Sequence, residues 1–196
     1  MSQTIIKGEN AIKNLPKVLK ELNAKKLLLV CDGSFDFLSI KEDILSLDVP
    51  VVMFSDFTPN PLYEDVANGV KLFRKENCDT ILAVGGGSSI DVAKCIKLFS
   101  KMNDSDVYLN QEFADTEVPL IAIPTTAGTG SESTRYAVIY YKGVKQSIAH
   151  LSIIPDVALL DFGVLATLPV YQKKCTLLDA LCQGIESWWS VNSTDE

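Results

Sequence analysis

The amino-acid sequence predicts an α/β fold, built on a mostly parallel sheet with helices on both faces. Short, continuous apolar runs recur along the chain, and segments with apolar residues at helical spacing separate them. A glycine-rich turn also joins one apolar run directly to the helical segment that follows it. Strands that alternate with helices are typical of βαβ units, which assemble into parallel sheets.

The elements are expected in the following order. Helical spacing predicts a first helix over residues 10–22, and Pro16 places the start of its regular part near Asn14. Further helices are expected at residues 40–47 and 63–73, and another from near Ser88. Continuous apolar runs predict strands covered on both faces at residues 27–30, 51–54, 80–84 and 118–123, and shorter runs predict strands at 136–141 and 157–160. The polar segment 103–115 is expected to be a surface loop.

The last helical pattern, over residues 171–192, differs from the others because it is rich in apolar residues. Leu177, Leu181, Ile185 and Trp188 form one stripe, with Leu178, Cys182 and Trp189 beside it. A helix with so much apolar surface needs a partner that covers it.

Composition narrows the classes of function. The 196 residues include 18 Lys and Arg against 25 Asp and Glu, a formal net charge of −7. Because a protein that binds nucleic acid needs a basic surface, nucleic acid is not an expected partner. No apolar run approaches the roughly 20 residues that span a bilayer, and the first residues lack the pattern of a signal peptide. We therefore expect a cytoplasmic protein with no membrane partner.

Cysteine and histidine usage narrows the chemistry further. Five cysteines form no Cys-x-x-Cys pair, so we expect reduced and mostly buried thiols rather than a disulfide framework or a zinc ribbon. The single histidine, His150, excludes a metal site that takes two imidazoles from this chain alone. A loop position or an internal hydrogen bond is its expected role.

A glycine-rich loop follows the strand predicted at residues 80–84. It consists of Gly85, Gly86 and Gly87, and Ser88 is the expected N-cap of the next helix, with Asp91 completing an arrangement like a capping box. Glycines let an anion approach the backbone, and the free N–H groups of a first helical turn bind it. The loop predicts a pyrophosphate site, and a tight turn without a ligand is the alternative.

A second loop of small and hydroxyl residues follows the strand predicted at residues 118–123. Its hydroxyls belong to Thr125, Thr126, Thr129 and Ser131. Because ligands of open α/β sheets lie outside the carboxyl ends of the strands, both loops belong to one edge and together suit a dinucleotide. A Ser/Thr-rich turn without a ligand is the alternative for this loop alone.

The order of several motifs along the chain resembles that of the iron-containing, metal-dependent alcohol dehydrogenase family. The motifs are Val30-Cys31-Asp32, Pro59-Asn60-Pro61, Gly85-Gly86-Gly87-Ser88 with Asp91 and Lys94, Pro124–Thr129, Pro155–Asp161, Leu168-Pro169, and Asp179-Ala180-Leu181 with Ile185-Glu186. The resemblance implies a Rossmann-like dinucleotide-binding domain over residues 1–168. Residues 169–196 would then begin an all-helical second domain, so that the chain is expected to be a fragment.

The resemblance also implies how an NAD or NADP cofactor would be held. Gly86, Gly87 and Ser88 would bind the pyrophosphate, Asn60 would lie beside the adenosine half, Thr125, Thr126 and Thr129 would line the nicotinamide side, Val138 and Lys145 would lie near the ribose, and Asp91 belongs to the same motif. Asp32 matches the position that accepts from a ribose hydroxyl and repels a 2′-phosphate, which favours NAD. A turn-capping aspartate is the alternative for Asp32.

A divalent metal, iron or zinc, is the second implied cofactor. The family holds it with one Asp and three His, and Asp179 matches the Asp while Gln183 stands at the first His position. An amide oxygen is a weaker ligand for these metals than imidazole. Asp179, Gln183 and Glu186 form a polar stripe, for which a solvated face is the alternative to a cleft-lining role.

The implied function is that of an NAD(P)-dependent oxidoreductase. It would interconvert a small alcohol and an aldehyde or ketone by metal-assisted hydride transfer, with this chain as its cofactor-binding part and inactive alone. The tail, residues 186–194, resembles the phosphonoacetaldehyde reductase subgroup. An inactive nucleotide-binding module and a dehydroquinate synthase-like enzyme are the alternatives, and assembly into a homo-oligomer stays open.

Overall fold

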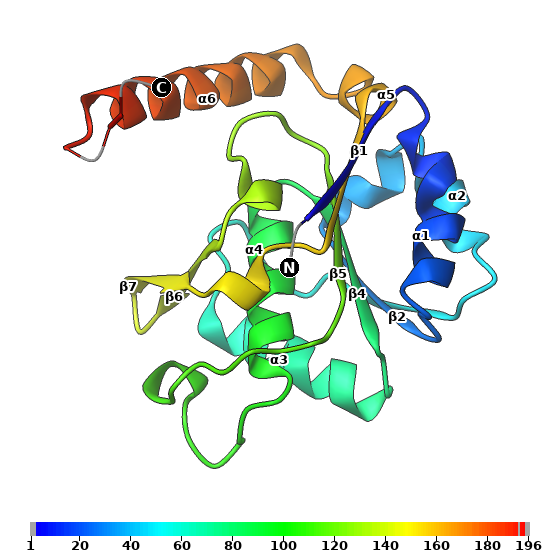
Figure 1. Cartoon of the computed structure of the whole chain (residues 1–196), viewed down its shortest axis with the longest axis vertical. Coiled ribbons are helices and arrows are strands. Elements are labelled where there is room, and N and C mark those ends of the chain that lie inside the picture. Colours follow the sequence, from blue (N-terminus) through cyan, green and yellow to red (C-terminus); the bar gives the residue numbers. More distant parts are fainter. Residues whose placement is uncertain (1–2, 192, 195–196) are drawn as a thin grey trace.

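The computed structural model describes residues 3–191 and 193–194 of the chain. Within these residues, six parallel strands form a sheet in the order β1-β8-β5-β4-β2-β3, and a separate antiparallel hairpin pairs β6 with β7 (Figure 1). The strands are β1 (Thr4–Gly8), β2 (Leu27–Cys31), β3 (Val51–Phe54), β4 (Thr80–Gly85), β5 (Leu120–Pro124), β6 (Tyr136–Tyr141), β7 (Val144–Ala149) and β8 (Val157–Asp161). The predicted α/β class with a mostly parallel sheet is confirmed.

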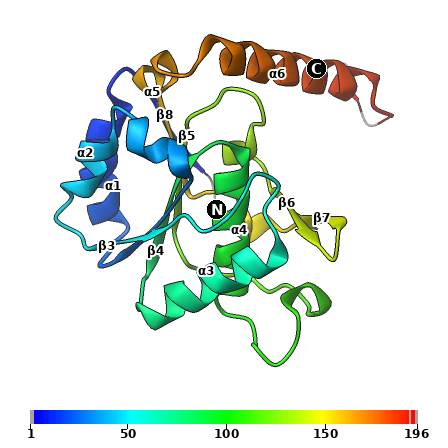
Figure 2. The same cartoon turned by 180° about the vertical axis from the view of Figure 1, so that it is seen from behind.

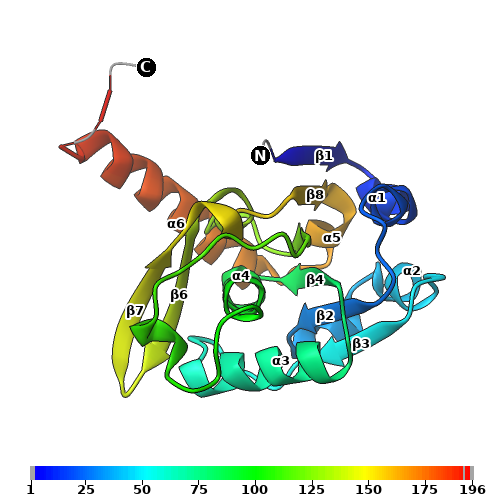
Figure 3. The same ribbon diagram turned by 60° about the horizontal axis from the view of Figure 1, so that its bottom comes forward.

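Helices cover both faces of this sheet (Figures 2 and 3). The α-helices are α1 (Leu15–Glu21), α2 (Lys41–Leu45), α3 (Tyr63–Lys75), α4 (Gly87–Phe99), α5 (Phe162–Ala166) and α6 (Val170–Trp189). Short 3-10 turns are η1 (Ala11–Asn14), η2 (Gly33–Phe37), η3 (Tyr108–Asn110), η4 (Ser131–Ser133) and η5 (Leu151–Ile153). One core lies between the sheet and α1 and α2, and the other lies between the sheet and α3, α4 and the hairpin.

Burial of the strands explains why continuous apolar runs predicted them. Every residue of β2, β4 and β5 is buried, as expected for inner strands covered on both faces. β3 is a strand as predicted, but the expectation that both of its faces are covered is wrong. It lies at the edge of the sheet, where Met53 is 45% exposed.

Two strands have no counterpart among the predicted elements. β1 lies at the other edge of the sheet and pairs with β8, in the register Thr4 with Val157. β7 returns from the turn at Lys142 and Gly143 and pairs with β6. Both are largely polar or exposed, so they lack the apolar run that marks an inner strand.

The segment 103–115 is a loop with one anchor. It is mostly exposed, as predicted, but η3 places Tyr108 in the core, with its ring stacked on Phe99 at 5.0 Å between centroids. Asp104 accepts hydrogen bonds from the Tyr108 hydroxyl and from Arg74 of α3. The loop is therefore fixed to α3 and α4.

The long helix α6 lies outside both cores, above the sheet in Figure 1, and approaches the rest of the molecule at Gly128. None of its residues is buried, and Trp188 and Trp189 are 76% and 75% exposed. It confirms the predicted helix, whose last predicted residue, Asn192, lies outside the described residues together with residues 195 and 196. No helix in the described part of the chain has the length and apolar character needed to cross a membrane.

Candidate functional site

The carboxyl ends of three neighbouring strands bring the predicted site residues together. β2 leads into Asp32, β4 ends at Gly85 and β5 ends at Pro124. The chain order reverses here, because β3 lies on one side of β2 and β4 on the other. Such a switch point is where open α/β sheets bind ligands. The Thr125 N–H donates to the Gly85 carbonyl over 2.9 Å, so the two loops begin side by side.

The glycine loop and the threonine loop face each other closely. A Cβ atom added to Gly87 would lie 2.9 Å from Cγ2 of Thr129, and one added to Gly86 would lie 3.6 Å from Thr126. A side chain at position 87 would press on Thr129, so this position favours glycine. The N–H groups of the first turn of α4 have no carbonyl partner within the helix and are available to an anion.

The start of α4 differs from the prediction. Gly86, not Ser88, is the N-cap, and no side chain caps the helix. The predicted capping box between Ser88 and Asp91 is wrong, because the helix begins earlier and the Asp91 carboxylate accepts from other groups. Ser88 lies in the first turn instead, where its N–H belongs to the anion-binding set.

Asp32 caps a turn and also reaches the glycine loop. Its Oδ1 accepts from the Ser34 N–H over 2.8 Å, and its Oδ2 accepts from the Ser89 hydroxyl over 3.2 Å. The turn-capping role is therefore confirmed. The half-buried carboxylate also lies beside the first turn of α4, where a ribose hydroxyl could be recognised.

Asp91 and Lys94 connect α4 to the chain that leaves the threonine loop. Asp91 accepts from the Ser131 hydroxyl over 2.6 Å and from the Val138 N–H over 3.0 Å. Lys94 is fully buried and donates to the carbonyls of Thr134 and Tyr136, each over 2.8 Å. Burial raises the pKa of Asp91 and lowers the pKa of Lys94 to about 8.

The hydroxyls of the threonine loop differ in their surroundings. Thr125 is buried, Thr126 is half-buried and Thr129 is exposed. The Oγ1 of Thr129 accepts from the Ser131 N–H over 3.2 Å, and the Ser131 hydroxyl binds Asp91. The Thr129 hydroxyl thus holds the loop itself, and the Ser131 hydroxyl joins it to α4.

Three further predicted residues lie on or near the hairpin. Val138 and Lys145 share one face of it, because Tyr140 pairs with Lys145 and side chains alternate along a strand. Asn60 is exposed in the left-handed conformation, at φ 59°, and the next carbonyl, of Pro61, accepts from the Tyr140 N–H over 2.8 Å. The loop with Asn60 is thus tied to β6.

Comparison with known proteins decides the family. The family described as iron-containing alcohol dehydrogenase matches residues 2–162, which is most of the chain. The chain belongs to the iron-containing alcohol dehydrogenase family. The predicted resemblance is thereby confirmed.

Individual relatives of this alcohol dehydrogenase family agree in sequence and fold. The chain is 34% identical to the NAD-dependent methanol dehydrogenase of Bacillus methanolicus over 95% of its length, and covers 51% of that protein. It matches the crystal structure of a 1,3-propanediol oxidoreductase with a TM-score of 0.90 and 30% identity, over 98% of this chain and 52% of the other. Sulfoacetaldehyde reductase from Bifidobacterium kashiwanohense, in complex with NAD+, gives 0.85 and 29% over 96% and 52%. The chain spans about half the length of these relatives.

The family metal is only partly provided for by the described residues. A Cβ atom on Gly128 of the threonine loop would lie 3.0 Å from Oδ2 of Asp179, and the Gln183 Nε2 donates to the Gly128 carbonyl over 3.4 Å. Both side chains therefore face that loop from α6; Asp179 is half-buried, and Gln183 and Glu186 are exposed. No group of three or more His, Cys, Asp or Glu side chains in the described ranges is placed to hold a metal ion. Two oxygen donors do not make a four-ligand site, so the residues present do not fit the metal by themselves.

The single histidine and the cysteines lie outside this proposed site. His150 accepts from the Ser152 N–H at the start of η5, which confirms its loop role. All five thiols are free: Cys31, Cys78 and Cys95 are buried, and Cys175 and Cys182 are exposed.

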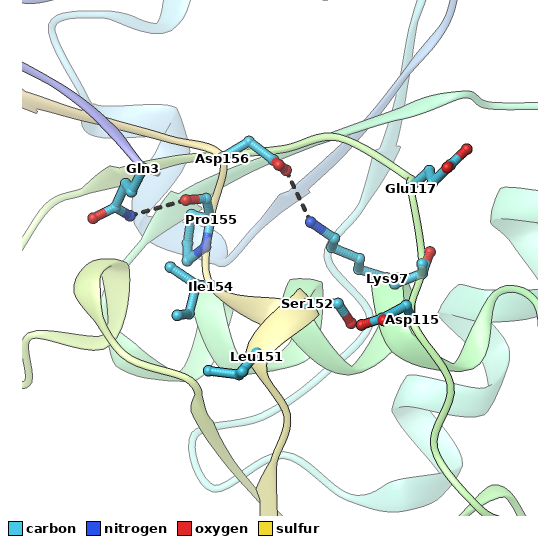
Figure 4. A pocket seen from close by; sticks show the side chains of 10 residues that line it. Gln3, Lys97, Asp115, Glu117, Leu151, Ser152, Ile154, Pro155 and Asp156 are labelled. Carbon is cyan, nitrogen blue, oxygen red and sulfur yellow. Dashed lines mark hydrogen bonds and ion pairs between the residues drawn. The ribbon is translucent and has the colours of Figure 1, made fainter. Parts of the chain in front are cut away.

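A hollow of about 420 Å³ lies beside the amino ends of β5 and β8, at the end of the sheet opposite to the glycine and threonine loops (Figure 4). The side chains at its rim are held within the chain: Lys97 donates to Asp156 over 2.8 Å and Gln3 to the Pro155 carbonyl over 3.0 Å. Because these residues lie at the amino ends of the strands, the hollow is separate from the glycine loop, which follows the carboxyl end of β4.

Proposed function

We propose that this chain is the cofactor-binding part of an NAD(P)-dependent oxidoreductase that interconverts a small alcohol and an aldehyde or ketone. The observation that carries the proposal is the glycine-lined N-terminus of α4, whose free N–H groups lie at the carboxyl ends of β4 and β5 beside the threonine loop. Membership of the family and the NAD-dependent relative support the choice of a dinucleotide. We further propose a cytoplasmic location.

The residues would divide the work of binding. Gly86, Gly87 and Ser88 would bind the pyrophosphate through backbone N–H groups, and local dipoles allow this despite the net charge of −7. Thr125, Thr126 and Thr129 would orient the nicotinamide side, Val138 and Lys145 the ribose, and Asn60 the adenosine half. When bound, the dinucleotide supplies a hydride donor or acceptor. Asp32 would favour NAD by repelling a 2′-phosphate.

We propose metal-assisted catalysis for the complete enzyme and not for this chain alone. Asp179 and Gln183 would contribute two oxygen donors to that site. Residues 169–196 would begin a second, helical domain, for which the exposed apolar face of α6 is the support. We therefore expect little or no turnover by this chain alone. A robust metal-dependent reduction of a small aldehyde by the 196-residue chain would overturn that expectation.

An anionic two-carbon aldehyde is our proposed substrate class within the family. The tail, residues 186–194, resembles phosphonoacetaldehyde reductases, and one similar structure is named a sulfoacetaldehyde reductase.

An inactive nucleotide-binding module is the second candidate, and the observation that favours it is Gln183, which replaces an imidazole and binds the Gly128 carbonyl.

Calorimetric titration with NADH and NADPH tests the binding part. Gly87→Asp should abolish binding, because its side chain would press on Thr129 and its charge would repel phosphate. Gly184→Asp on α6 is the matched control, since a Cβ atom there would meet nothing within 4 Å. We expect the control to bind like the parent. Absence of binding to either nucleotide by the parent would sink the proposal.

A further inference from the structure

A single helix holds both proposed cofactor loops. α4 begins in the glycine loop, and one turn later its Asp91 and Lys94 side chains bind the segment that leaves the threonine loop. Ser131 is the residue where they meet. Its hydroxyl donates to Oδ1 of Asp91 over 2.6 Å and lies 3.3 Å from Nζ of Lys94.

The contacts of this pair extend from Ser131 to the hairpin. Lys94 donates to the carbonyls of Thr134 and Tyr136 over 2.8 Å, and Asp91 accepts from the N–H of Val138 over 3.0 Å. The bonded groups therefore span residues 131–138, between the threonine loop and the face that carries Val138 and Lys145.

Stability alone is a poor explanation for this arrangement. A fully buried lysine loses its hydration, and the groups bonded to Lys94 are neutral hydroxyls and carbonyls, which offset that loss only in part. Buried charged networks instead fix one geometry when every member is satisfied, as here. What this network fixes is the exit of the threonine loop relative to the glycine loop.

We propose that Asp91, Lys94 and Ser131 are positioning residues that hold the threonine loop at the distance from the glycine loop that the dinucleotide requires. The inference rests on the proposed function, and it gives Asp91 a role through Ser131 instead of direct contact with the cofactor. Loops held in the binding geometry before the ligand arrives bind more tightly, because less freedom is lost on binding.

The same helix supplies matched controls. Lys97, three residues beyond Lys94, is also buried, but it pairs with Asp156 at the opposite edge of the sheet (Figure 4). Ser100 is a buried serine like Ser131, and its hydroxyl donates to the Lys97 carbonyl over 2.8 Å. Lys97→Met and Ser100→Ala thus remove comparable buried groups away from the loops.

The experiment compares Lys94→Met and Ser131→Ala with these two controls by NADH titration. Hydrogen exchange over residues 125–138 is measured on the same proteins without nucleotide. We expect Lys94→Met and Ser131→Ala to weaken NADH binding about tenfold, as for a lost buried hydrogen bond, and to speed exchange in that segment. The controls should change affinity less than about twofold, and Ser131→Thr, which keeps the hydroxyl, should restore parental behaviour.

The outcomes separate this inference from the proposed function. Equal weakening in test and control variants, or unchanged exchange over residues 125–138, overturns the positioning role. If the parent binds no nucleotide, the proposed function fails, and the exchange comparison still decides whether the network holds the loop. Ser131→Ala removes only one oxygen atom, so it keeps the test open if Lys94→Met does not fold.

Discussion

Asp32 combines a structural and a proposed recognition role in one carboxylate. One oxygen accepts from the N–H of Ser34 and the other from the hydroxyl of Ser89. The amide oxygen of an asparagine can still accept from Ser34 and an alanine loses both bonds, whereas repulsion of a 2′-phosphate needs the negative charge. Two substitutions at this one residue therefore separate its two roles.

We expect Asp32→Asn to raise the affinity for NADPH relative to NADH by about tenfold, the effect of one removed charge repulsion near 1.4 kcal/mol. Because its amide oxygen still accepts from Ser34, the free energy of unfolding should stay near that of the parent. Asp32→Ala should lose about 1 kcal/mol in addition, since it removes the cap. Titration measures the two affinities, and urea unfolding measures the free energy of unfolding. An unchanged ratio of the affinities for NADPH and NADH in Asp32→Asn would contradict the recognition role.

The buried lysine of α4 makes stability depend on pH. Burial lowers the pKa of Lys94 to about 8 in the folded chain, against partial compensation from Asp91, Cys95 and Glu132, whereas an unfolded lysine titrates near 10.5. Between these values the unfolded state binds more protons than the folded state. Stability contributed by this residue therefore rises as the pH rises from about 8 towards 10.5.

We expect the parent to gain stability relative to Lys94→Met over that range, by about 1 kcal/mol per pH unit. The difference between the two proteins removes the titration of the cysteines and tyrosines, which both share. Urea unfolding at pH 7, 8.5 and 9.5 is the measurement. A difference that stays constant across the three values would show that Lys94 is not held in a lowered-pKa environment.

At the scale of elements, the inner strands were predictable and the edge elements were not. Strands buried on both faces form at residues 27–30 and 80–84, and a continuous apolar run is what indicates such an inner strand in a sequence. β1 and β7 were missed because only one face or one edge is covered, and their sequences are mixed. The helix start at Ser88 was misplaced because glycines cap α4 without any side chain.

The candidate site was predictable in its loops and not in its internal bonds. The glycines of one loop are consecutive in the sequence and the hydroxyl residues of the other lie close together, so each loop could be predicted from its own short segment. The bonds of Asp91 and Lys94 to residues 131–138 join segments some 40 residues apart, and only the fold brings these together. A lysine in an apolar helix, three residues after Asp91, was the one available signal.

The helix α6 approaches the threonine loop at one glycine. A Cβ atom on Gly128 would lie 2.8 Å from the Thr176 carbonyl, so Gly128→Ala should displace α6 and speed its hydrogen exchange. Gly184→Ala, where a Cβ atom would meet nothing within 4 Å, should do the opposite and stabilise the helix by about 1 kcal/mol. Exchange rates over residues 170–189 test both, and slower exchange in Gly128→Ala would contradict the close approach.

At the scale of the whole molecule, α6 contributes little to the two cores. None of its residues is buried, and both cores are built from residues of the α/β unit. A chain that ends at Leu168 should therefore unfold at a temperature within about 4 °C of the full chain, the shift that a change below 1 kcal/mol produces at this size. Thermal unfolding followed by circular dichroism measures it. A fall of more than 10 °C, judged on the same scale, would show that residues 169–196 are part of the α/β unit.

The pairing of β1 with β8 has a consequence for the order of folding. Thr4 lies opposite Val157, so β1 pairs with a strand that follows it by about 150 residues. Contacts between such distant segments close large loops and form slowly. β2, β3 and β4 pair with one another within a much shorter stretch of chain, so we expect them to assemble before β1 meets its partner. We therefore expect the pairing of β1 with β8 to complete the sheet last.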